Sequence, residues 1–87
     1  MNWKDETSYS QSEKERIPRT WSVKLADMRL VVTRSHGLEG WFVDSAITGR
    51  RQLKSEEVAP AQIEALKMVR AIVNAIASEI HIPSESA

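Results

Sequence analysis

The chain has 87 residues, no cysteine, and twelve basic side chains balanced by twelve acidic ones. This length accommodates one domain. The lack of cysteine excludes disulfides, thiolate zinc sites and thiol nucleophiles, and it fits the cytoplasmic location that we expect. The first six residues are polar and acidic, unlike a secretory signal, and charged residues interrupt the longest apolar stretch, 63–82. We therefore expect no membrane-spanning segment.

The balanced total conceals three zones of different charge. Residues 1–18 carry three basic and four acidic side chains, a net charge of −1. Residues 19–54 carry seven basic and three acidic side chains, a net charge of +4, and residues 55–87 carry two and five, a net charge of −3. Zoned charge of this kind can orient a partner.

The N-terminal segment lacks apolar periodicity, and we predict that residues 1–16 form a flexible tail. Trp3 and Tyr9 are its only aromatic residues; they either tether the tail to the core or remain exposed. Because Pro18 disfavours a helix through the residue before it, the ordered domain is predicted to span residues 17–82. Residues 83–87 are predicted to be a disordered C-terminus.

Residues 21–54 alternate between apolar and polar side chains, which indicates strands. We predict two strands joined by a tight turn at Asp27-Met28, a loop over 35–40, and a third strand from Trp41. A turn at Thr48-Gly49 then leads to residues 50–54, a short edge strand or an extended arm. The side chains predicted to face a helix are Trp21, Val23, Leu25, Leu30, Val32, Trp41 and Val43.

A long helix is predicted to follow. Ser55 is read as its capping hydroxyl, and Pro83 as the residue that ends it after about Ile80. The fold is therefore α+β, a three- or four-stranded antiparallel sheet on one C-terminal helix in β-β-β-α order.

The apolar arc of this helix spans roughly 200° of the helical wheel, more than the roughly 100° that one contact face needs. The helix is also longer than six-residue strands, which span about 20 Å. Something else must pack on it: the N-terminal tail, a second copy of the chain, or a target protein. The partner or dimer face is predicted at Met68, Ile72, Ile76 and Ile80.

The opposite face of the sheet is predicted to be basic with one exposed aromatic, a pattern that suits a phosphate backbone. The alternative is a solvated face that charge keeps soluble, and Asp44 weakens the nucleic-acid interpretation. Clustered arginines near the hairpin tip also suit phosphates or carboxylates. The predicted nucleic-acid or anion-binding residues are Lys24, Arg29, Arg34, Phe42, Arg50, Arg51 and Lys54.

No catalytic or metal-binding pattern is present. His36 and His81 have no carboxylate or second histidine at ligand spacing. We expect no enzyme activity, no metal, no cofactor and no small-molecule substrate.

The order of three strands and a helix, with Gly40-Trp41 entering the third strand and the Ala-rich helix start 59–66, resembles two groups of proteins. One is the AP2-type and integrase amino-terminal DNA-binding domains, whose three-stranded sheet enters the major groove. The other is a set of small bacterial and phage proteins built on the same plan. The resemblance covers residues 21–80 as a pattern, and it assigns no base-contacting residue.

Two functions follow as hypotheses. The leading one is a non-catalytic binding module whose basic sheet face docks nucleic acid. The alternative is a protein-interaction or inhibitor module that uses the surplus apolar surface of the helix, as a homodimer or with another protein.

Overall fold

The computed structural model describes residues 2–7, 18–34 and 40–83. Four parts of the sequence-based predictions fall outside these ranges. They are the tail between residues 8 and 16 with Tyr9, residue 17 at the predicted domain start, the glycine loop over 35–39 with His36, and the C-terminus over 84–87.

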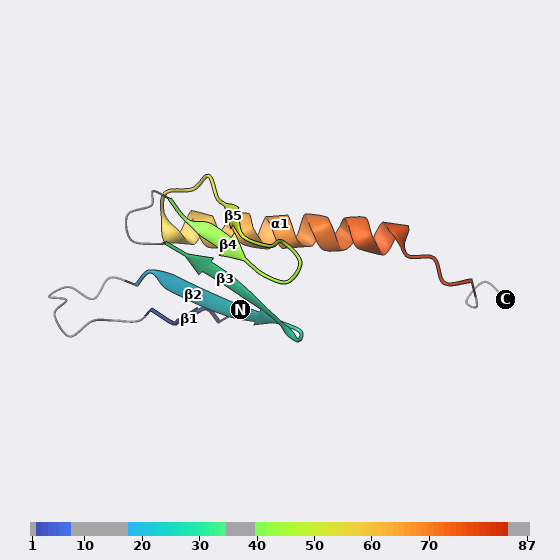
Figure 1. The fold of residues 1–87 in the computed structure, drawn as a ribbon, viewed down its shortest axis with the longest axis horizontal. Coiled ribbons are helices and arrows are strands. Elements are labelled where there is room, and N and C mark those ends of the chain that lie inside the picture. Colours follow the sequence, from blue (N-terminus) through green and yellow to red (C-terminus); the bar gives the residue numbers. More distant parts are fainter. Residues whose placement is uncertain (1, 8–17, 35–39, 84–87) are drawn as a thin grey trace, which may run out of the picture.

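The described chain is α+β: a five-stranded antiparallel sheet with one helix across one of its faces (Figure 1). The strands are ordered β1-β2-β3-β4-β5 across the sheet, so each strand pairs with its neighbour in sequence. The elements are β1 (Lys4–Asp5), β2 (Thr20–Leu25), β3 (Met28–Thr33), β4 (Phe42–Asp44), β5 (Arg51–Gln52) and α1 (Val58–Glu79).

The α+β class and the C-terminal helix are confirmed, but the sheet has five strands rather than three or four. The extra strand, β1, lies in the segment predicted to be a tail: Lys4 is opposite Ser22 in β2, and Asp5 is opposite Trp21. The hydroxyl of Thr7 accepts hydrogen bonds from the backbone N–H of Arg19 (2.7 Å) and of Thr20 (2.9 Å). Backbone pairing and these hydrogen bonds hold the strand, and Trp3, the residue before it, is half-buried against the core, as a tether would be.

The connection between β2 and β3 differs by one residue from the predicted turn. Leu25 pairs with Met28, which leaves a two-residue turn at Ala26-Asp27. Ala26 has a φ of 54°, a left-handed conformation in which its Cβ is crowded. Some two-residue hairpin turns need a positive φ at the first of the two turn residues, and glycine usually occupies that position.

Ala26→Gly is therefore expected to raise the free energy of unfolding by about 0.5 kcal/mol. Relief of the left-handed strain outweighs the greater backbone entropy of glycine in the unfolded chain. Urea denaturation measures the change, and Ala46→Gly, at an exposed residue for which the structure gives no positive φ, is the control that should not gain stability. Equal effects of the two substitutions would contradict the strain assigned to Ala26.

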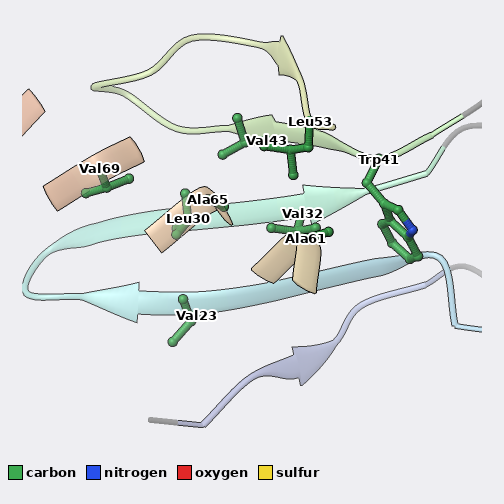
Figure 2. Packing of buried hydrophobic residues seen from close by; sticks show 9 residues of the cluster. All are labelled: Val23, Leu30, Val32, Trp41, Val43, Leu53, Ala61, Ala65 and Val69. Carbon is green, nitrogen blue, oxygen red and sulfur yellow. The ribbon is translucent and has the colours of Figure 1, made fainter. Parts of the chain in front are cut away.

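The core lies between α1 and the inner face of the sheet. Leu30, Val32 and Val43 are fully buried, and Figure 2 shows Ala61 and Ala65 of α1 over the central strand β3. Small alanine side chains let the helix approach the sheet closely. The remaining members of the buried cluster are Val23, Trp41, Leu53 and Val69. The predicted inner face is thereby confirmed at its central positions, while Trp21 and Leu25 are half-buried against the core.

The helix begins at Val58, within the interval 56–61 expected from the sequence, but its capping residue differs from the prediction. Its N-cap is Glu57, whose side chain makes no capping hydrogen bond, so Ser55 is not the cap. The Ser55 hydroxyl instead donates to the Glu64 carboxylate (2.8 Å), which also accepts from the backbone N–H groups of Ser55 (3.0 Å) and Lys54 (2.8 Å). Glu64 therefore fastens the segment after β5 to the second turn of α1.

Glu64 is expected to give the protein a pH-dependent element of stability. Partial burial raises the pKa of its carboxyl, but the hydrogen bonds from Lys54 and Ser55 and the charge of Lys54 outweigh burial and lower the pKa below its ordinary value of 4.5. The carboxylate thus stabilises the fold fully above the unfolded-state pKa, and this contribution is lost as the pH falls through the lower folded-state pKa.

Glu64→Gln is expected to cost about 1 kcal/mol at neutral pH, after allowance for solvent screening, and to flatten the loss of stability in acid. Urea denaturation at neutral pH and below pH 4 measures both effects. Glu79→Gln, at an exposed residue at the other end of α1, should leave the acid dependence unchanged. An unaltered acid dependence in Glu64→Gln would contradict this role.

Candidate functional site

The helix α1 continues well beyond the end of the sheet (Figure 1). Its buried residues are Ala61, Ala65 and Val69, all in its first twelve positions. From Arg70 to Glu79 every residue is exposed except the half-buried Ile72. About 15 Å of helix, at 1.5 Å per residue, therefore projects past the strands.

The face of α1 that packs on the sheet stays apolar along this projection. Val73, Ile76 and Ile80 follow Val69 at spacings of four, three and four residues, which keeps them on one face of a helix. Their exposed fractions are 43%, 47% and 60%, and Ile82, just past the helix, is 47% exposed. We call Val73, Ile76 and Ile80 the distal stripe. The distal stripe continues the side of α1 that packs in the core, but the sheet does not extend over it.

The structure divides the predicted partner face. Met68 packs against the core and Ile72 is half-buried, whereas Ile76 and Ile80 are exposed on the projection. Val73 belongs to the exposed surface but was not predicted as part of it. Its place on the apolar arc was visible in the sequence, but the position at which the sheet ends was not.

An apolar groove lies where the sheet ends and the projection begins. It has a volume of about 770 Å³ and opens to solvent. The turn after β2 forms one wall, the loop between β4 and β5 the other, and the first residue of the distal stripe lies between them. The lining residues are Leu25, Ala26, Asp27, Met28, Ala46, Ile47 and Val73. The distal stripe and this groove form one continuous apolar surface.

The outer face of the sheet holds four of the seven predicted anion-binding residues. Lys24 is opposite Arg29, and Phe42 is opposite Thr33, in positions that alternate with the buried ones. The Arg50 guanidinium lies 5.1 Å from the centre of the Phe42 ring, on the same face. Lys4 in β1 also lies on this face, opposite Ser22. Lys4 was not among the predicted residues, because β1 itself was not predicted.

Charge on this face is partly neutralised. Arg29 forms an ion pair with Glu6, the residue after β1. Asp44, opposite Val31, adds a second carboxylate to the same face. The outer face is therefore of mixed charge rather than a uniformly basic surface.

The other three predicted residues lie elsewhere. Arg51 is opposite Val43, whose side chain is buried on the helix side of the sheet, so Arg51 points to that side. Arg34 lines a cavity of about 440 Å³ with Glu56 and Glu57 near the start of α1. Lys54 lies at the Glu64 attachment. The predicted set of seven therefore does not form one surface.

Among the residues that the structure describes, no three histidine or acidic side chains gather where they could hold a metal ion. In the same part of the chain, α1 included, no helix has the length and apolar character needed to cross a membrane.

Comparison of the chain with known proteins found no matching family model, no matching curated protein and no matching solved structure.

Proposed function

We propose that this protein is a non-catalytic binding module that docks a protein surface through the distal stripe and the adjoining groove. The observation that carries the proposal is the continuation of the core-facing stripe of α1 past the end of the sheet. Single exposed apolar side chains are common on protein surfaces, whereas a continuous apolar patch beside a groove is typical of interaction sites.

The chemistry of this surface favours a protein partner. On a helical wheel, Asn74 points about 160° away from Ile76, whereas the charged residues Arg70 and Glu79 flank the distal stripe, about 60° from Val73 and from Ile76. The centre of the surface is therefore aliphatic, with charge at its rim. Covering the exposed half of Val73, Ile76 or Ile80 contributes roughly 1 kcal/mol for each side chain. Apolar anchors on one helix face that enter a partner's surface are a recurring mode of recognition.

Site-specific photo-cross-linking tests this proposal. A photoreactive amino acid at Ile76 should give a cross-linked protein product in cells that express the chain. The same probe at Ile63 should not, because Ile63 is 54% exposed on α1 but lies off the distal stripe. No product from Ile76, or equal products from both positions, would contradict the proposal.

Nucleic-acid docking is the second candidate, and the pairing of a cation with an aromatic ring supports it. Arg50 over Phe42, with Lys24 on the same face, resembles the combination of charge and stacking used on nucleic acids. Because Arg29 is paired with Glu6, it should contribute less than Lys24.

For this candidate, Lys24→Glu is expected to weaken binding of duplex or single-stranded nucleic acid and to reduce its salt dependence by about one phosphate contact. Arg29→Glu should have a smaller effect. Fluorescence anisotropy at low salt measures both. Absence of salt-dependent binding by the unmodified chain would reject nucleic-acid docking.

A further inference from the structure

We infer that the surface covering the distal stripe is that of a second copy of this chain, with the two α1 helices packed antiparallel. This inference rests on the proposed function and names the partner. The position of the sheet, the spacing of the stripe and the location of the groove support it.

The sheet leaves a space of the right depth for a helix. Helices pack on one another at interaxial distances of about 8–10 Å, close to the roughly 10 Å at which two sheets stack face to face. The sheet covers the first half of the apolar face of α1 and ends at the groove. A second helix laid against the distal stripe therefore continues the layer that the sheet begins.

The direction of the second helix follows from the sheet. If the two helices were parallel, contact between their distal stripes would bring the first half of each helix against the other copy's sheet. Each sheet already covers Ala61, Ala65 and Val69 of its own helix, so the two copies would clash. Antiparallel helices avoid this clash, because each first half, with its sheet, lies beyond the tip of the other helix. Only the antiparallel arrangement lets both stripes be covered at once.

The spacing of the stripe suits this arrangement. A two-fold axis level with the midpoint between Val69 and Ile80 places Val73 of one copy level with Ile76 of the other. It also places Ile80 of each copy level with Val69 of the other, where the sheet ends and the groove opens. Each copy thus supplies an exposed isoleucine at its helix tip and an apolar groove to receive it. Such self-complementarity is what a two-fold interface requires.

The expected dimer is small and reversible. About 15 Å of helix from each copy, together with two grooves, places the interface near the lower end of the roughly 1,200–2,000 Å² of stable complexes. Dissociation in the micromolar range is therefore expected, so the oligomeric state should depend on concentration.

Sedimentation equilibrium of the full chain tests the inference. The unmodified chain should pass from monomer to dimer with rising concentration, and Ile76→Lys should weaken dimerisation at least about tenfold. Ile63→Lys is the matched control: it makes the same change on the same helix, off the stripe, and should retain the dimer. Equal loss of dimer in both variants would overturn the assignment of the interface to the distal stripe.

Engineered cysteines test the antiparallel arrangement, since the chain has none of its own. The double variant Ala46→Cys with Ile80→Cys should form disulfide-linked dimers under mild oxidation, because the tip of one helix reaches the other copy's groove. Ile80→Cys alone should not, since the two tips lie roughly 16 Å apart along the axis. Efficient cross-linking by Ile80→Cys alone would overturn the antiparallel arrangement.

The two proposals fail differently. If the chain sediments as a monomer up to millimolar concentration while the probe at Ile76 captures a different protein, the second copy is rejected and the docking function stands. If the chain is monomeric and Ile76 gives no product, both are rejected.

Discussion

Replacing Leu30 with alanine is expected to lower the free energy of unfolding by about 3 kcal/mol, a typical cost for removing a buried leucine. Leu30 is 0% exposed on the central strand β3, opposite Val23 and beneath Ala65 of α1 (Figure 2). Neighbouring side chains on a paired strand cannot collapse into the space that it leaves. Because native proteins are stable by only about 0.05–0.15 kcal/mol per residue, this loss is a large fraction of the total stability of the chain.

Urea denaturation followed by tryptophan fluorescence and circular dichroism measures this loss. Leu25→Ala is the control, since Leu25 is half-buried at the edge of the groove. It should cost about 1 kcal/mol, in proportion to the apolar surface removed from contact. Equal costs for the two leucines would mean that the core is not centred on β3.

A lysine placed on α1 is expected to destabilise the fold strongly in the first half of the helix and hardly at all in the second. Ala65→Lys puts a charged side chain at a position that is 0% exposed against the sheet. It should cost at least about 3 kcal/mol, because the helix must move away from the sheet or bury an unpaired charge. Loss of helical circular dichroism in mild denaturant measures this effect.

A lysine eleven residues later should have little effect on the stability of the isolated chain. Ile76→Lys lies at a position that is 47% exposed on the projection, so in dilute solution the free energy of unfolding should change by less than about 0.5 kcal/mol. A cost close to that of Ala65→Lys at low concentration would mean that the chain's own residues cover Ile76. The distal stripe would then not be a docking surface.

The parts of the fold that depend on a repeating pattern were predictable. The alternation of Trp21, Val23 and Leu25 identified β2 and its inner face, and the helical spacing after residue 58 identified α1 to within a few residues of each end. The strand β1 was not predictable in this way. Two polar residues, Lys4 and Asp5, carry no period, and they join the sheet through backbone pairing that any sequence can make.

The missed strand also explains an incomplete prediction of the outer face. The ion pair between Arg29 and Glu6 exists only because β1 lies beside β2, and the sequence separates these two residues by 23 positions. The surplus apolar surface of α1, in contrast, was predicted from its width and length. Which residues remain uncovered depends on where the strands end, and only the three-dimensional structure gives that position.

Amide hydrogen exchange along α1 tests most directly whether the distal stripe needs a surface from outside the chain. In dilute solution we expect the amides of Ile76 to Ile80 to exchange at least about tenfold faster than those of Ala65 to Val69, because no sheet covers the projection. When the stripe is occupied, at high concentration of the chain or with a cross-linked partner, the two sets of rates should converge. Slow exchange of Ile76 to Ile80 in the dilute chain would show that the helix is already covered, and would contradict the proposed docking surface.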